Sequence, residues 1–187
     1  MLSDAQIAPY CQGDLDSLCG LYAIINALCA LCPEIDEEIA SALFNHLVRA
    51  LEKRLKQPMP AVAYGLDPQA LQELLGKAIR YLERHLEITI QQSDLRVPGR
   101  KPELKKVWDA LASRLNGEHV AILQLRGVRE HWTVAYIATE TTLRLIDSGS
   151  RKILARSRCT LKASRSKFQI VPAQIILFSR TEKPQPW

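Results

Sequence analysis

A cysteine stands near the start of an almost wholly apolar stretch, Leu18 to Leu31, which the sequence predicts to be a buried helix. Cys19 would then lie in the first turn, where unpaired backbone N–H groups and the positive end of the helix dipole favour a thiolate over a thiol. Gly20 follows directly and leaves the mouth of the helix without a side chain, so that a substrate backbone could approach closely. Cys19 is therefore a candidate nucleophile.

A thiol nucleophile needs a base, and the base needs a partner that orients it. His131 opens one predicted strand and Asp147 closes the next. A hairpin centred on residue 139 would place the two side chains opposite each other, and one centred on residue 140 would make them diagonal neighbours on the same face. In either register Asp147 is expected to hold one imidazole nitrogen and leave the other for Cys19.

Two further side chains lie close to this cysteine in sequence. Gln12, on the loop that enters the predicted helix, offers a side-chain N–H that could stabilise an oxyanion together with the backbone N–H of Cys19. Asn26 falls within the helix and is expected to satisfy buried backbone groups rather than to react.

These motifs together resemble those of the papain-like cysteine peptidases, which carry Cys, His and Asp or Asn in this chain order. The match consists of Gln12, Cys19-Gly-Leu-Tyr22, His131-Trp-Thr-Val134 and Leu145-Ile-Asp-Ser148. The His-Trp and Asp-Ser elements more particularly resemble those of the ubiquitin-like-protein proteases, the SUMO proteases and adenovirus-type peptidases. In those enzymes the His and Asp precede the Cys, so this chain resembles a permuted relative.

The resemblance implies a role for each matching residue. Cys19 would be the nucleophile, His131 the base and later the acid, Asp147 the residue that orients the imidazole, and Gln12 the oxyanion donor. Trp132 would match the aromatic side chain that covers a narrow channel for a Gly-Gly tail. The implied substrate is a protein or peptide, with a ubiquitin-like tail as one class, and the chemistry needs no metal or organic cofactor.

Other residues compete for the same roles. Cys11 lacks a following Gly, and Cys159 lies among cations that are expected to lower its pKa but has no base near it in sequence. His119 opens another predicted strand without a carboxylate at hairpin distance. His46 and His85 fall in or at the end of amphipathic helices and are expected on the surface.

The pair Cys29-x-x-Cys32 invites a metal or redox interpretation. Zinc sites usually have two such pairs or a matching His pair, and the sequence has neither. The pair also lies near the C-terminal end of its predicted helix, where the dipole disfavours a thiolate. We therefore expect both cysteines to pack in the core.

The elements that position these residues follow from periodicity and capping. Four helices are expected, at Leu18–Leu31 with Ser17 or Asp16 as N-cap, Ile35–Leu55, Asp67–Leu82 with a Pro in the first turn, and Pro102–Leu115. Short strands are expected at Leu86–Ile90, Val120–Leu125, Trp132–Ile137, Leu143–Ile146 and Ile175–Phe178. Helices first and strands later predict an α+β fold with an N-terminal helical lobe packed on an antiparallel sheet. The resemblance implies the papain-like version of that class.

Length and composition fit one domain. The 187 residues are 47% hydrophobic and 24% charged, which predicts a single domain over residues 1–182 and a flexible tail at 183–187. No apolar run approaches the roughly 18 residues of a membrane span. The five cysteines are an odd number without disulfide-scaffold density, which suits a reducing compartment. We expect a cytoplasmic protein, or one delivered from the cytoplasm into another cell.

Positive charge is concentrated at the C-terminal end. Residues 1–150 carry a net charge of −3 and residues 151–187 a net charge of +8, with seven cations and no acid in the segment 151–167. This segment is interpreted as a solvated surface or as a docking site for an acidic protein. Nucleic acid is disfavoured because aromatic side chains are nearly absent from it.

Three classes of function remain open. The first is a cysteine peptidase that cleaves a peptide or isopeptide bond through a thioester at Cys19. The second is an amidase, deamidase or acyl transferase that uses the same three residues and differs in what attacks the thioester. The third is a catalytically silent basic module that binds protein, since folds outlive their activities.

Overall fold

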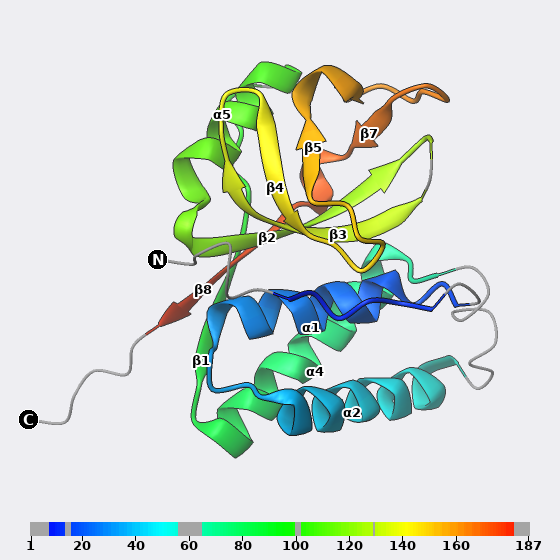
Figure 1. Ribbon diagram of the computed structural model, residues 1–187, viewed down its shortest axis with the longest axis vertical. Helices are drawn as coiled ribbons and strands as arrows, with labels where there is room; N and C mark the ends of the chain where they lie inside the picture. The colour runs from blue at the N-terminus through cyan, green and yellow to red at the C-terminus, as the bar shows by residue number, and fades with distance from the viewer. Residues whose placement is uncertain (1–7, 14–15, 56–64, 100–101, 129, 182–187) are drawn as a thin grey trace, which may run out of the picture.

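The computed structural model describes residues 8–13, 16–55, 65–99, 102–128 and 130–181. Within these residues the chain forms four α-helices and eight strands, which confirms the α+β class (Figure 1). The helices are α1 (Cys19–Leu31), α2 (Glu37–Leu55), α4 (Pro68–Leu86) and α5 (Leu104–Arg114). The strands are β1 (Thr89–Asp94), β2 (Asn116–Arg126), β3 (His131–Ala138), β4 (Thr142–Ile146), β5 (Ile153–Ala155), β6 (Cys159–Thr160), β7 (Phe168–Ile170) and β8 (Ile176–Thr181). The expected tail at 183–187 lies outside the described residues.

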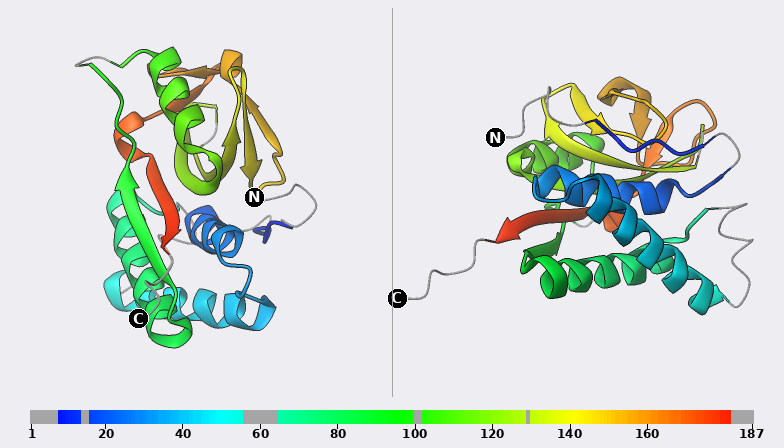
Figure 2. Two further views of the ribbon diagram at one scale, coloured as in Figure 1. Left: turned by 90° about the vertical axis from the view of Figure 1, so that its left-hand side faces the viewer. Right: turned by 60° about the horizontal axis from the view of Figure 1, so that its bottom comes forward.

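The strands form one sheet in the order β1-β8-β2-β3-β4-β5, with every neighbouring pair antiparallel. Strand β7 also pairs with β2, and β6 pairs with β7 in parallel. Helices α1, α2 and α4 gather on one side of the molecule, and α5 lies on the other side with the curved strands (Figures 1 and 2). In the described part of the chain, no helix has both the length and the apolar character required to cross a membrane.

Two hydrophobic clusters meet across this sheet, and β2 contributes to both. Val120 and Ile122 belong to the cluster with α1, α2 and α4. Ala121, Leu123 and Leu125 belong to the cluster with α5. Because successive side chains of a strand point to opposite faces, this alternation places β2 between the two clusters, buried on both faces.

The start of α1 differs from the expectation. Ser17 or Asp16 was the predicted N-cap, but the N-cap is Leu18, which makes no side-chain capping bond. Asp16 instead accepts backbone N–H groups from Gly13 at 3.0 Å and from Leu18 at 2.9 Å. The prediction was wrong because this carboxylate organises the loop before the helix rather than the helix itself.

Other boundaries shifted for local reasons. Helix α4 continues to Leu86, and Glu87 then adopts a left-handed conformation with φ 55°, so the strand expected at Leu86–Ile90 begins only at Thr89. Helix α5 begins at Leu104 rather than at Pro102. Strands β5, β6 and β7 are three, two and three residues long, too short for an alternating pattern to reveal them.

A bulge in the β3–β4 hairpin decides which residues share a face. At the turn, the N–H of Thr139 donates to the carbonyl of Thr142 at 2.8 Å, and Ala138 pairs with Leu143. The pairing shifts by one residue at Tyr136, so that Ala135 pairs with Leu145 beyond it. Pairing beyond the bulge is therefore centred on residue 140, which is the diagonal register that the sequence allowed. Without the shift, the side chains of His131 and Asp147 would point to opposite faces of the hairpin.

The predicted cap of α4 is confirmed and can be tested. The side chain of Asp67 accepts the N–H of Ala70 at 2.7 Å at the start of the helix. Asp67→Ala is expected to lower the free energy of unfolding by about 1 kcal/mol because that N–H loses its partner. Urea denaturation measures the change. Asp67→Asn keeps an acceptor and should stay close to the wild type, so an equal loss in both variants would contradict the capping role.

Candidate active site

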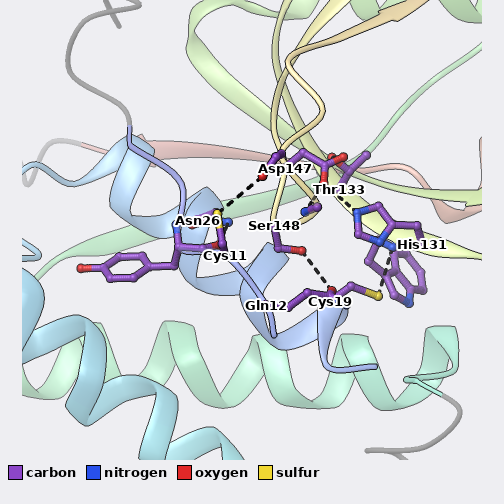
Figure 3. A network of polar contacts seen from close by, with 12 residues as sticks. Cys11, Gln12, Cys19, Asn26, His131, Thr133, Asp147 and Ser148 are labelled. Atoms are coloured by element: carbon purple, nitrogen blue, oxygen red, sulfur yellow. Dashed lines mark hydrogen bonds and ion pairs between the residues drawn. The ribbon is translucent and has the colours of Figure 1, made fainter. Parts of the chain in front are cut away.

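His131, Asp147 and Cys19 meet at one end of the β3–β4 hairpin, where it reaches the start of α1. The Nε2 atom of His131 lies 2.8 Å from Oδ1 of Asp147. The Cys19 thiol lies close enough to the ring to raise the pKa of His131, and it donates to the carbonyl of Ser17 at an S···O distance of 3.9 Å. Figure 3 shows the ring between the carboxylate and the sulfur. Because Asp147 occupies Nε2, Nδ1 is the nitrogen left for Cys19. The structure therefore brings together the three residues that the sequence singled out.

The carboxylate of Asp147 is buried and fully engaged, with a side chain that is 1% exposed. The N–H of Gly149 and the hydroxyl of Thr133 donate to it, the hydroxyl at 3.1 Å. Burial alone would raise the pKa of Asp147, but the hydrogen bonds and the charge of His131 outweigh it and lower the pKa. Asp147 is therefore held as an anion behind the imidazole.

His131 is correspondingly a strong base. Its side chain is 10% exposed, and burial by itself would lower its pKa. The hydrogen bonds with Asp147 and Cys19 act in the opposite direction and raise the pKa of His131 from its ordinary value of 6.5 to about 9. A histidine with this pKa takes up a proton readily from a neighbouring thiol.

The sulfur of Cys19 has a second contact that sequence reasoning missed. The backbone N–H of Trp132 points to it at an N···S distance of 3.5 Å, although 113 positions separate the two residues in the chain. The sulfur of Cys19 thus lies between the start of α1 and a backbone donor of β3. No sequence pattern reports such a contact because it depends on how α1 docks against β3.

Thr133 was also missed, although a signal for it existed. It lies two residues after His131 on the same face of β3 and, in the register beyond the bulge, opposite Asp147. Its hydroxyl and the N–H of Gly149 hold the two carboxylate oxygens from different directions. Strand alternation around a candidate His would have indicated Thr133 as a partner of the carboxylate.

Gln12 makes hydrogen bonds to the chain segments on both sides of the site, at Ser148 and at Asp16. Its backbone N–H donates to the carbonyl of Ser148 at 3.2 Å, and the Ser148 hydroxyl donates to its Oε1 at 3.3 Å. Its Nε2 donates one hydrogen to the carbonyl of Asp16 at 3.1 Å, which leaves the second hydrogen of the amide available. Gln12 thus lies between the residue after Asp147 and the loop that leads to Cys19.

Asn26 holds the N-terminal segment in place, as expected. Its Oδ1 accepts the N–H of Tyr10 at 2.8 Å, and its Nδ2 donates to the carbonyl of Tyr10 at 3.0 Å. These two bonds fix the backbone two residues before Gln12 against α1. Asn26 therefore satisfies backbone groups and does not contact the sulfur of Cys19.

Two predicted substrate contacts have a different environment from the one expected. Gly20 is buried, and a Cβ atom there would lie 2.9 Å from Leu66 and 3.1 Å from Leu71. Its missing side chain makes room for these leucines rather than opening the mouth of the helix, so that interpretation was wrong. Trp132 is 3% exposed, and its indole N–H donates to the carbonyl of Leu66 at 2.9 Å. The part of Trp132 that contacts the sulfur is its backbone.

Burial raises the pKa of three cysteines that lie outside the site. It raises the pKa of Cys29 to about 12, of Cys32 to about 11 and of Cys159 to about 12. The expectation that cations lower the pKa of Cys159 was wrong, because its burial outweighs Lys167 and Arg151. Cys11 is exposed.

The rival histidines lie outside the site. His46 and His85 are exposed and flank the ring of Tyr81, at centroid distances of 5.1 and 4.4 Å. His119 lies beside Arg114, and burial lowers its pKa, with Arg114 adding to the effect. Among the residues that the structure describes, no three His, Cys, Asp or Glu side chains group as metal ligands would.

No protein-family model matches the chain, and no curated protein matches it.

The raised pKa of His131 predicts how stability depends on pH. Because the folded-state value of about 9 exceeds the ordinary 6.5, this group stabilises the fold fully below pH 6.5 and loses its contribution as pH rises through 9. We expect the free energy of unfolding to fall over this interval, as measured by urea denaturation at several pH values. His131→Gln should flatten the curve between those limits. The same decline in that variant would show that another group causes it.

Proposed function

We propose that the protein is a cysteine hydrolase of papain-like type that cleaves a peptide or isopeptide bond. The observation that carries the proposal is an imidazole that lies 2.8 Å from a buried carboxylate and whose pKa is also raised by the nearby thiol of Cys19 at a helix N-terminus. A buried carboxylate that orients an imidazole toward a thiol is the arrangement that thiol acyl transfer requires. The chain order of the motifs supports the same class.

The first half of the reaction forms a thioester. His131 takes the proton of the Cys19 thiol, and the sulfur attacks the carbonyl carbon of the substrate. As the tetrahedral intermediate collapses, His131 returns the proton to the leaving amine and the bond between carbonyl carbon and nitrogen breaks. In the second half, His131 removes a proton from water, whose oxygen attacks the thioester carbon. The carbon–sulfur bond then breaks, His131 returns the proton to the sulfur of Cys19, and the acid is released.

Two donors are suited to the negative oxygen of the intermediate. The backbone N–H of Cys19 belongs to the first turn of α1, where N–H groups have no partner within the helix. The second hydrogen on Nε2 of Gln12 comes from a side chain whose other amide atom is held by Ser148. We therefore assign Gln12 as the side-chain oxyanion donor and Ser148 as the residue that positions it.

The thiol assignment predicts selective labelling. Iodoacetamide at neutral pH is expected to alkylate Cys19 faster than the other four cysteines because His131 can accept its proton. Peptide mapping by mass spectrometry after brief exposure measures each site, with the exposed Cys11 as an internal reference. In His131→Ala, labelling of Cys19 should fall to the rate of Cys11 or below. Equal rates for Cys11 and Cys19 in the wild type would favour a silent binding module.

Electrophilic probes can then identify the substrate class and the reaction. Tails of ubiquitin-like proteins that end in an electrophile test the class that the His-Trp and Asp-Ser motifs suggest. Mass spectrometry of treated substrates distinguishes chain cleavage, conversion of an amide to an acid, and a crosslink. These products correspond to a peptidase, a deamidase and an acyl transferase.

The oxyanion assignment predicts a graded loss of turnover. Gln12→Ala is expected to lower kcat by about 100-fold, since it removes one donor to the developing charge. Ser148→Ala should cost less because it removes only the bond that orients the amide, and Ser148→Thr keeps the hydroxyl and should recover most of the rate. Steady-state kinetics on the substrate found above would measure these effects. A change confined to KM in Gln12→Ala would contradict the assignment.

A further inference from the structure

Two hollows flank the chain directly after Asp147, and both are lined by Asp147 and Arg151. The smaller, of about 40 Å³, also includes His131 and Gly149. The larger, of about 570 Å³, extends to Lys152 and to the N-terminal segment. Its volume is within the usual range for binding sites. The turn after β4 therefore connects the base of the proposed reaction to a larger recess.

Cations predominate in the larger hollow. Arg144 of β4 lines it together with Arg151 and Lys152. Of the described residues that line it, Asp147 is the one carboxylate, and its oxygens are bound by His131 and by other donors of the site. Among the described lining residues, no further acidic side chain faces Arg151 and Lys152, so this part of the recess favours an anionic ligand.

Arg151 is held at the border of the two hollows. Its guanidinium lies 4.7 Å from the centre of the Phe168 ring, a geometry that holds the cation by attraction to the aromatic face. On the other side of the turn, the carbonyl of Lys152 accepts the N–H of Leu145 at 2.9 Å, which anchors this backbone to β4. Arg151 thus has a defined position and lines the smaller hollow together with His131.

Most of the remaining lining residues are apolar, which favours a polypeptide ligand. Ile153 is 54% exposed, one of two large hydrophobic side chains that the described residues expose, and Ala8 and Pro9 form another part of the wall. Nucleic acid would need exposed aromatic faces on which bases stack. The aromatic residues nearby, Tyr136 and Phe168, are 7% and 4% exposed.

We propose that this recess, which we call the basic recess, binds an acidic segment of the protein substrate on the leaving-group side of the scissile bond. His131 must return its proton to the leaving amine, so the leaving group lies on the His131 side of Cys19, where Arg151 is. Carboxylates of the substrate pair with Arg151 and Lys152, and an aliphatic side chain packs on Ile153. The link to catalysis rests on the proposed function, whereas the binding site itself does not.

Binding is tested without chemistry in the Cys19→Ala protein. A fluorescent peptide rich in Asp and Glu with one Leu is titrated by anisotropy, beside a peptide in which Asn and Gln replace the acids. The acidic peptide is expected to bind about tenfold more tightly than the neutral one and to weaken as salt is raised. Equal affinity for the two peptides would overturn the proposal.

Matched charge variants locate the site. Arg151→Gln/Lys152→Gln should weaken binding of the acidic peptide by about tenfold. Arg158→Gln/Lys162→Gln removes the same charge from exposed residues of the same segment that line neither hollow, and it should change affinity by less than about twofold. Equal losses of affinity in the two double variants would mean that the peptide is attracted by the overall positive charge of the segment and not by a defined site, which would overturn the proposal. Tighter binding of an RNA or DNA oligonucleotide that depends on Arg151 would also overturn the proposal.

The binding and labelling experiments distinguish a failure of the basic-recess proposal from a failure of the hydrolase proposal. If the acidic peptide binds as expected but Cys19 is not labelled selectively, the basic recess stands and the hydrolase does not. If Cys19 is labelled selectively but the neutral and acidic peptides bind alike, the hydrolase proposal stands and the basic recess does not. Where both succeed, an acidic leaving group should lower KM, and Arg151→Gln/Lys152→Gln should abolish that advantage with little change in kcat.

Discussion

The hydrogen bond between His131 Nε2 and Asp147 Oδ1, 2.8 Å long, is the interaction on which the rest of the site depends. It keeps the carboxylate ionised, raises the basicity of the imidazole and leaves Nδ1 for the sulfur of Cys19. The bond exists only because both side chains point from the same face of the hairpin. That condition follows from one extra residue in β3, the bulge at Tyr136, which shifts the register set by the turn at Thr139.

The short segment after β4 serves several parts of the molecule at once. Asp147 holds the imidazole, Ser148 holds Gln12 by both backbone and side chain, and the N–H of Gly149 returns to the carboxylate. Ser150, with φ 65°, donates its N–H to the carbonyl of Asp147 and directs the chain toward Arg151. A shift of this segment would therefore affect the base, the proposed oxyanion donor and the basic recess together.

Electrostatics in this protein are decided more by burial and hydrogen bonding than by nearby charge. Cys159 has Lys167 and Arg151 near it, yet its burial raises its pKa to about 12. His131 is also buried, and its pKa rises to about 9 because two specific partners outweigh the loss of water. The difference explains why a cluster of cations in sequence is a poor guide to a reactive thiol, and why a well-placed carboxylate is a better guide to a base.

The sequence by itself determined the features that depend on neighbours in the chain: the apolar helix that contains Cys19, the cap at Asp67, the α+β order of elements and the two hairpin registers that bring His131 near Asp147. The three-dimensional structure decided between those registers, through the bulge at Tyr136. It also aimed the Trp132 N–H at the sulfur, filled the space beside Gly20 with Leu66 and Leu71, and buried Cys159. Helical period, caps and strand parity act over a few residues and can be read locally. Contacts between residues more than one hundred positions apart depend on how the helices dock on the sheet, which no local pattern records.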